Sequence, residues 1–356
     1  MATSKSQAEA ANKFRDVLSS VLPDLLGQVN GSSKMDKVKQ ALRDISYNYR
    51  TGLSQASTRF RSDWIDATNR CAYVFLYLVQ HCNLVYYSLQ SSGVSDSWSP
   101  YMSELKVCSI GGGPGSDLVG LATFLQHVYD IPPMLDCLVL DLYSNWKRAW
   151  DTIARFLPGK MYVDYSRCDL VHDAGLQLSD RQFVQDADII TLVKSFSAVA
   201  AFFRRDKSQG KVLRAIFREI KPGCHVLYID NDHNGDTEFQ NDFATPAGLE
   251  LVFEERGYQS VPSGSDSHVI QQYCHDLDFN PMRGCDVNMQ LYRKKRPVEA
   301  TPSVSKRLPA YVPRNDTVCC YGFFELIFGV VCLILCLAFY IGIGYGLYRL
   351  GYWLLW

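Results

Sequence analysis

The chain has 356 residues, with 36 lysines and arginines against 37 aspartates and glutamates, so its formal net charge is -1 at pH 7. A hydrophobic content of 47% supports a large folded core and excludes a disordered or collagen-like chain. The balanced charge gives no global attraction to nucleic acid. The 12 cysteines form no C-x-x-C pair and the first 14 residues are polar. We therefore expect no signal peptide and a cytosolic protein without disulfides.

The first 100 residues are predicted to form a helical region. Residues 71–89 are strongly apolar but carry Gln80, His81 and Asn83 at their centre. This composition predicts a packed core helix rather than a membrane span. The turn-forming segment at residues 91–100 marks the end of the region. Near the beginning of the chain, apolar residues recur at the spacing of a helix: Phe14, Val17, Leu18, Val21, Leu22 and Leu25.

Beyond residue 100 the pattern changes to short apolar strands that alternate with helices. The expected strands are residues 105–110, 135–141, 160–165, 187–193 and 225–230, and helices between them include 117–128, 146–156 and 212–220. A last helix is expected at residues 249–258, before a closing strand pair that includes 287–295. The fold class is therefore α/β, with a doubly wound, mainly parallel, seven-stranded sheet over residues 101–296.

The most informative segment is VCSIGGGPGSDLVGLATFL, in which a strand enters a glycine-dense turn and then a helix. Such a turn lets the backbone approach a ligand at the carboxyl end of the first strand. The dinucleotide fingerprint requires a third small residue where the chain has Ser116. The phosphate-binding P-loop is excluded because no Gly-Lys-Ser or Gly-Lys-Thr follows the turn.

The spacing G-x-G-x-G at Gly111, Gly113 and Gly115 resembles the first motif of class I S-adenosylmethionine-dependent methyltransferases. The resemblance covers about residues 101–296 and includes the segment IKPGCHVLYID before and within the fifth strand. It implies S-adenosylmethionine as the cofactor, with Asp141 on the ribose hydroxyls and Asp169 near the adenine amino group. The implied cofactor-binding residues are Gly111, Gly112, Gly113, Gly115, Asp141, Leu142, Asp169 and Leu170.

One position departs from the family pattern. Ser109 stands where the family carries an acidic residue at the start of its first motif. On this alignment, Ser109→Asp would restore the usual charge and is expected to keep or tighten cofactor binding. The departure also leaves open a second function, that of a catalytically inactive methyltransferase-like scaffold.

The loop after the fifth strand supplies the candidate catalytic residues, Asp230 and His233, because a histidine beside carboxylates can take a proton at neutral pH. The loop also resembles a calcium loop, but its twelfth position is Asn241, so no metal is predicted. Between residues 204 and 221, seven basic residues stand against two acidic ones. A solvated helix face is favoured there over an RNA-binding or lipid-binding patch.

The last part of the chain is predicted to anchor the protein in a membrane. Residues 297–325 have the composition of a flexible linker, and residues 326–348 carry no charge. As a helix these residues would span about 35 Å, enough for a hydrocarbon core of about 30 Å. The preceding lysines and arginines place the α/β domain in the cytosol, as in a single-pass, tail-anchored protein. Gly342 and Gly346 favour a homodimer through this helix.

The sequence therefore predicts a membrane-anchored, S-adenosylmethionine-dependent methyltransferase whose acceptor is unknown. The first alternative is the inactive scaffold at a membrane. A nicotinamide-dependent oxidoreductase is the second alternative, and the spacing of the glycines disfavours it.

Overall fold

The computed structural model describes residues 2–51, 55–58, 61–98, 105–130, 132–157, 159–231 and 235–296. Contacts between residues define one compact unit, Met1–Val298. The predicted linker, the predicted membrane segment with its glycine pair, and His233 lie outside the described residues. Within the described residues, every helix is too short or too polar to cross a membrane.

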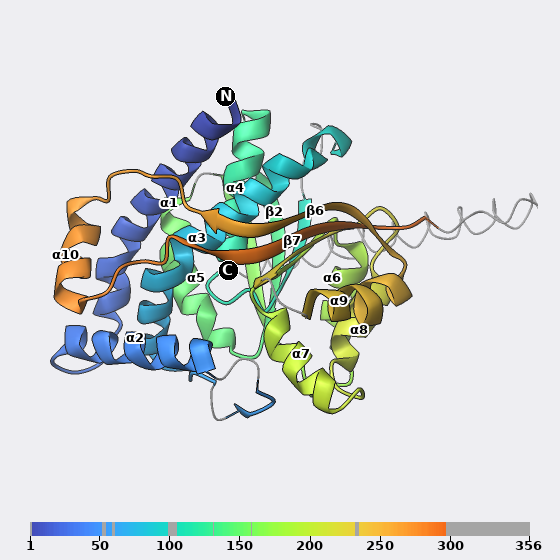
Figure 1. Ribbon diagram of the computed structural model, residues 1–356, viewed down its shortest axis with the longest axis horizontal. Helices are drawn as coiled ribbons and strands as arrows, with labels where there is room; N and C mark the ends of the chain where they lie inside the picture. Colours follow the sequence, from blue (N-terminus) through green and yellow to red (C-terminus); the bar gives the residue numbers. More distant parts are fainter. Residues whose placement is uncertain are drawn as a thin grey trace, which may run out of the picture. The chain divides into compact units, whose positions relative to one another are not determined.

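A seven-stranded sheet forms the centre of the first unit, which confirms the predicted α/β fold class (Figure 1). Its order is β3-β2-β1-β4-β5-β7-β6. The first five strands are parallel, and β7 pairs antiparallel with both β5 and β6. The strands are β1 (Leu105–Ile110), β2 (Met134–Asp141), β3 (Lys160–Arg167), β4 (Ile189–Val193), β5 (His225–Asn231), β6 (Leu249–Ser260) and β7 (Gly284–Lys294).

Helices cover both faces of the sheet (Figure 1). One face packs against α1, α3, α4 and α5, and the other packs against α6, α7 and α8. The helices are α1 (Ala2–Gly27), α2 (Lys34–Thr51), α3 (Ala67–Ser92), α4 (Ser116–Tyr129), α5 (Lys147–Ile153), α6 (Leu178–Asp186), α7 (Phe196–Arg205), α8 (Lys211–Glu219), α9 (Gly235–Glu238) and α10 (His268–Leu277). Short 3-10 turns lie at Val94–Ser97, Ser144–Trp146, Ala154–Phe156 and Thr245–Ala247, and a π-helical turn lies at Phe239–Ala244.

The central strands are buried on both faces, which explains their continuous apolar sequences. In β1, Val107 belongs to the core beneath α3 and α4, whereas Cys108 belongs to the core beneath α7 and α8. The same alternation places Leu227 and Tyr228 of β5 in different cores. Successive side chains of a strand point to opposite faces, so each central strand contributes to the cores on both sides of the sheet.

The helices of the N-terminal region, α1, α2 and α3, belong to the same compact unit as the sheet. The predicted apolar face of α1 is buried, and α3 begins at an Asp66 cap and ends at Gly93 in a left-handed conformation. Helices α3 and α4 lie so close that a Cβ at Gly120 would be 2.6 Å from the carbonyl oxygen of Cys82. This close packing fixes the N-terminal helices against the sheet.

The prediction of a helix at residues 249–258 is wrong, because these residues form most of β6. Leucine and glutamate favour helices, but this segment pairs with β7 from Leu249 to Ser260 and has a register shift between Leu251 and Phe253. The hydrogen-bonded pairing of this edge strand with the buried strand β7 outweighs the helical propensity of its residues. The helix of this part of the chain, α10, follows β6 instead.

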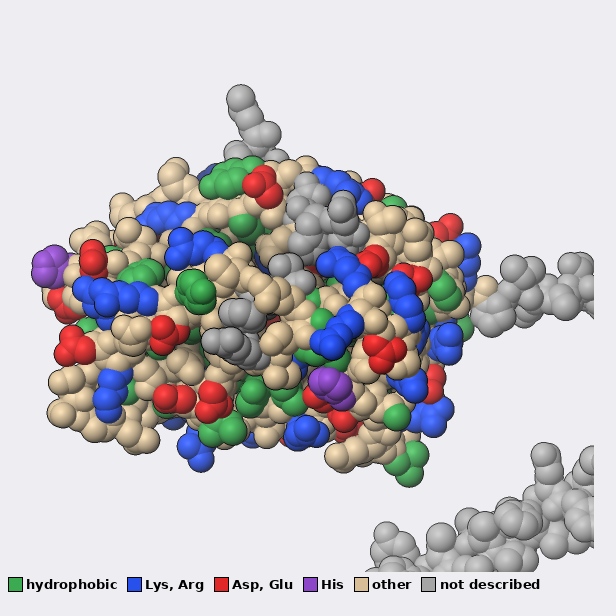
Figure 2. Space-filling view, turned by 60° about the horizontal axis from the view of Figure 1, so that its bottom comes forward, with side chains coloured by type: hydrophobic (Ala, Val, Ile, Leu, Met, Phe, Trp, Pro, Cys, Tyr) green, Lys and Arg blue, Asp and Glu red, His purple; other side chains and the backbone are tan. Residues whose placement is uncertain are grey.

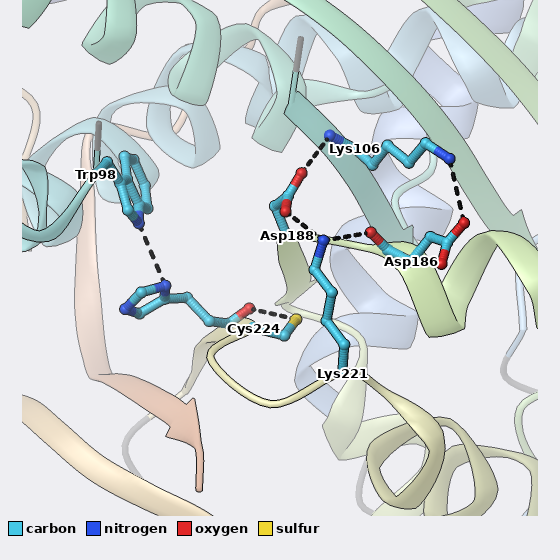
Figure 3. Close-up of polar contacts among 7 residues, drawn as sticks. Trp98, Lys106, Asp186, Asp188, Lys221 and Cys224 are labelled. Carbon is cyan, nitrogen blue, oxygen red and sulfur yellow. Dashed lines mark hydrogen bonds and ion pairs between the residues drawn. The ribbon is translucent and has the colours of Figure 1, made fainter. Parts of the chain in front are cut away.

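Polar contacts close the amino-terminal end of the sheet, opposite the glycine turn (Figure 3). The Asp188 carboxylate accepts hydrogen bonds from the Lys106 backbone N–H at 3.0 Å and from Lys221 Nζ at 2.5 Å. Trp98 Nε1 donates to His225 Nδ1 at 3.2 Å. Burial lowers the pKa of His225 to about 4, so its ring is neutral and can accept this bond. This end of the sheet is therefore engaged in structural contacts.

Candidate active site

A pocket opens at the carboxyl ends of the parallel strands, where open α/β sheets bind ligands. The glycine turn after β1, the end of β2 and the segments after β3 and β4 all contribute to it. Six of the eight predicted cofactor residues line it: Gly111, Gly113, Asp141, Leu142, Asp169 and Leu170. Gly111 and Asp169, which are 58 positions apart in the sequence, thus line the same pocket.

Two glycines of the turn face the pocket. Gly111 has φ 62° and Gly113 has φ 51°, a left-handed region that side chains disfavour. A Cβ at Gly111 would lie 2.6 Å from Cβ of Ser195. The Tyr165 hydroxyl donates to the Gly113 carbonyl at 3.0 Å and so fixes the turn. The turn therefore lines this edge of the pocket without side chains of its own.

The other two glycines lie behind the turn and serve packing. A Cβ at Gly112 would be 1.8 Å from Oγ of Ser109, and a Cβ at Gly115 would be 2.6 Å from Cε3 of Trp150. Gly115, with φ 79°, is also the residue before α4. These two positions require glycine because neighbouring side chains occupy the space of a side chain.

Asp117, in the first turn of α4, supplies a carboxylate beside Ser109. Its Oδ2 accepts a hydrogen bond from Ser109 Oγ at 2.6 Å and another from the Thr191 hydroxyl. Ser109 and Thr191 are register partners on β1 and β4, so one carboxylate joins two strands to the helix. Burial raises the pKa of Asp117, and the two hydroxyl donors lower it in part. An acidic group from the helix thus lies beside Ser109.

Asp141, the last residue of β2, is 8% exposed and faces the pocket. Its Oδ2 accepts the Gly113 backbone N–H at 3.1 Å, and its Oδ1 accepts the Tyr143 N–H at 2.9 Å. Burial raises its pKa to about 6, although these backbone donors act in the opposite direction. At neutral pH the carboxylate is mostly ionised, and each oxygen retains a lone pair for a ligand.

Asp169 follows β3 and is held in a tight turn at the pocket wall. Its Oδ1 accepts the Val171 N–H at 3.0 Å, and its Oδ2 lies 3.0 Å from Nδ1 of His172. Burial acts to raise the pKa of Asp169, but these hydrogen bonds prevail and hold it below its usual value. Leu142 and Leu170 add apolar surface next to the two carboxylates. The combination is suited to a ligand with a polar edge and an apolar ring.

Asp230 has a structural role that differs from the catalytic one predicted for it. The side chain is fully buried and lies outside the pocket lining. Its carboxylate accepts hydrogen bonds from the Ser197 hydroxyl at 2.6 Å, from the Ser197 N–H at 2.8 Å and from the Asn231 N–H at 2.8 Å. Asp230 therefore caps the start of α7, and it has no access to a substrate.

Aromatic side chains from the N-terminal region cover the pocket, and these residues were not predicted as part of the site. Tyr49, Trp64 and Tyr73 line it together with Trp146. The ring centroids of Trp64 and Trp146 are 5.1 Å apart, as are those of Trp64 and Tyr73. The sequence shows an aromatic-rich stretch here, but periodicity alone cannot distinguish a core from a cover over a ligand.

Basic side chains between residues 204 and 221 are partly neutralised by acidic neighbours. Arg204 pairs with Glu238 at 2.8 Å, and Lys207 pairs with Asp242 at 3.5 Å. On the face shown in Figure 2, lysine and arginine side chains are interspersed with aspartate and glutamate. Part of the positive charge of this segment is therefore balanced by neighbouring carboxylates.

The sequence matches no protein-family model and no curated protein. Among solved structures, the chain is similar to a candidate class I S-adenosylmethionine-dependent methyltransferase from Listeria monocytogenes, with 11% identity, TM-score 0.38, and coverage of 85% of this chain and 91% of that one. It is also similar to precorrin-6y C5,15-methyltransferase from Geobacter metallireducens, with 10% identity, TM-score 0.35, and coverage of 58% and 89%. A methyltransferase from Pyrococcus furiosus shows 10% identity, TM-score 0.36, and coverage of 61% and 85%.

Similarity at this level of identity concerns the fold alone. The chain's own Rossmann-like sheet and its glycine turn at the end of β1 agree with the class I methyltransferase resemblance that the sequence indicated. The fold is thus a Rossmann-like α/β sheet with helices on both faces.

Proposed function

We propose that the protein is an S-adenosylmethionine-dependent methyltransferase that binds its cofactor in the pocket at the carboxyl ends of β1 to β4. The observation that carries the proposal is the position of Asp141. A buried, mostly ionised carboxylate is fixed by two backbone donors and faces a space walled by a glycine turn and two leucines. A ribose diol can donate two hydrogen bonds to such a group.

The residues of the pocket fit each part of this cofactor. Asp141 would hold the ribose hydroxyls, and Leu142 and Leu170 would contact the faces of the adenine. The backbone at Gly111 and Gly113, which lines the pocket, would lie next to the amino-acid end. When bound, the cofactor supplies a methyl group on a positively charged sulfur. The protein's contribution is to exclude water with its aromatic cover and to align the acceptor with that methyl group.

The pKa of Asp141 predicts how cofactor binding depends on pH. Hydrogen bonds from a diol favour the ionised carboxylate, whose pKa in the free protein is about 6. Affinity should therefore fall as pH decreases through 6, and the dissociation constant of S-adenosylhomocysteine should rise about tenfold from pH 7 to pH 5. Calorimetry over this range measures the change.

The matched control for this experiment is Asp141→Asn, which keeps the shape of the side chain and removes its titration. This variant should bind more weakly at pH 7 and lose most of the pH dependence. If wild type and Asp141→Asn show the same pH profile, the ribose contact assigned to Asp141 is incorrect.

We further propose that residues 326–348 anchor the protein in a membrane. Support comes from the sequence: 23 uncharged residues follow a stretch that contains Lys306, Arg307 and Arg314. The full chain should sediment with membranes and resist carbonate extraction, and truncation after Asp316 should release it. Recovery of the full chain in the soluble fraction would contradict the anchor, and protection of the α/β domain from protease in intact vesicles would contradict its cytosolic orientation.

A further inference from the structure

A second cavity, of about 440 Å³, adjoins the proposed cofactor pocket. The two share Tyr49 and Lys194, so a ligand in one lies next to a ligand in the other. The second cavity lies at the carboxyl ends of β4 and β5, beneath α2 and α3. Its lining residues are Ser46, Tyr49, Arg50, Tyr77, Gln80, His81, Lys194, Asn231, Phe279, Met282 and Cys285.

An unpartnered amide lies in the wall of this cavity. Gln80 of α3 is 2% exposed, and neither its Nε2 nor its Oε1 has a hydrogen-bond partner within the described residues. A buried amide without partners destabilises the folded protein, because it has lost its hydrogen bonds to water. A ligand that both donates and accepts a hydrogen bond would satisfy it, as a hydroxyl group does.

The charges around the cavity favour an acceptor that carries negative charge. Among the described lining residues, the charged ones are Arg50 and Lys194, and none is acidic. Lys194 Nζ donates to Asn231 Oδ1 at 2.6 Å and to Cys285 Sγ at 3.5 Å, which leaves one of its three donors. Its φ of 57° is a conformation that non-glycine residues rarely adopt, so the backbone here is held against its preference.

Stacked rings form one side of the cavity. Tyr77 stacks on Tyr49 at 5.3 Å and on His81 at 5.3 Å, with interplanar angles of 27° and 17°. Burial and the charge of Lys194 lower the pKa of His81 to about 3, so this ring adds no positive charge. A planar ligand can extend such a stack. Since a cavity of about 150 Å³ holds benzene, this one accommodates a molecule of one or two rings.

We propose that this cavity binds the methyl acceptor, and that the acceptor is a small hydroxylated aromatic molecule methylated on its phenolic oxygen. The inference rests on the proposed function. The hydroxyl loses its proton to water, and Lys194 stabilises the resulting oxyanion. A lone pair of that oxygen forms the new oxygen–carbon bond, while the sulfur–carbon bond breaks and its electron pair stays on sulfur. The products are a methyl ether and a neutral thioether.

The test uses the full chain saturated with S-adenosylhomocysteine and the probe 4-nitrophenol, whose ionised form absorbs visible light. Binding beside Lys194 should lower the pKa of the probe and raise its absorbance at a fixed pH below that pKa. With S-adenosylmethionine in place of the product, the protein should release 4-nitroanisole. Benzylamine and benzoate serve as a cationic and a carboxylate comparison, and neither should be methylated.

Two variants separate the roles of the cavity residues. Lys194→Met should abolish the absorbance change and weaken probe binding about tenfold or more, whereas Lys211→Met, which removes the same charge from an exposed helix position, should change neither. Gln80→Leu should weaken probe binding about fivefold. The same substitution should keep or raise the melting temperature, because it removes two unpartnered buried atoms.

The outcomes distinguish this inference from the function on which it rests. Cofactor binding without 4-nitrophenol binding, or methylation of benzylamine or benzoate in its place, would overturn the phenolic acceptor and leave the methyltransferase. A lower melting temperature for Gln80→Leu would overturn the role given to its amide. Failure of both S-adenosylhomocysteine and S-adenosylmethionine to bind would overturn the function itself.

Discussion

Ser109→Asp should destabilise the protein by about 3 to 5 kcal/mol, the range for an uncompensated buried charge. Ser109 is fully buried, and its hydroxyl donates to the Asp117 carboxylate at 2.6 Å. The substitution removes this donor and places a second carboxylate against the first. The sequence motif predicted kept or tighter cofactor binding for this variant, because it treated Ser109 as a missing acidic group. In the structure a carboxylate from α4, that of Asp117, already lies beside Ser109.

The matched control is Ser109→Asn, which is similar in size to the aspartate and can donate to Asp117 without adding charge. The penalty of Ser109→Asp relative to Ser109→Asn should shrink as pH falls from 7 to 4. Burial beside Asp117 should make the pKa of the introduced carboxyl higher in the folded than in the unfolded state. Such a group lowers stability as pH rises, so the penalty is largest at pH 7 and smallest at pH 4. Urea unfolding at each pH measures it. Equal stability of the two variants at pH 7 would show that Asp117 does not place a negative charge beside residue 109.

Asp141→Ala should weaken the binding of S-adenosylhomocysteine by about 10-fold to 150-fold, which corresponds to the loss of hydrogen bonds to a charged group. Stability should also fall, because the Gly113 and Tyr143 N–H groups lose their acceptor. Calorimetry gives the affinity, and thermal unfolding gives the stability of the variant.

Asp180→Ala is the control for this comparison. Asp180 is also 8% exposed, and it accepts a hydrogen bond from Ser166 outside the cofactor pocket. Its removal should leave affinity within about twofold of wild type, even where stability falls. Equal losses of affinity in Asp141→Ala and Asp180→Ala would mean that the effect is a general loss of structure.

Sequence periodicity predicted the interior of the fold well because buried parallel strands have short, continuous apolar runs. The predicted strand at residues 105–110 coincides with β1, and that at 225–230 differs from β5 by one residue. The prediction failed at the edge. Strand β6 has one exposed face and a sequence rich in glutamate, so its pairing with β7 was visible only in three dimensions.

Motif spacing likewise brought six cofactor residues to one pocket, because the carboxyl ends of parallel strands meet at one edge. It could not reveal the Ser109–Asp117 contact, since eight residues separate the partners across a turn. The sequence suggested that the N-terminal helices cover the site, but it did not identify Tyr49 and Trp64, which reach the pocket only through tertiary packing. Asp230 shows the converse error: a polar residue at a strand end was taken as catalytic but caps a helix.

The most direct test of the central claim is calorimetric titration of the full wild-type chain with S-adenosylmethionine, followed by NADH in the same cell. The account predicts one cofactor per chain and no heat from NADH, because the glycine turn lacks the dinucleotide fingerprint. Binding without methyl transfer to any acceptor would favour the inactive scaffold. Binding of NADH with no response to S-adenosylmethionine would contradict the account.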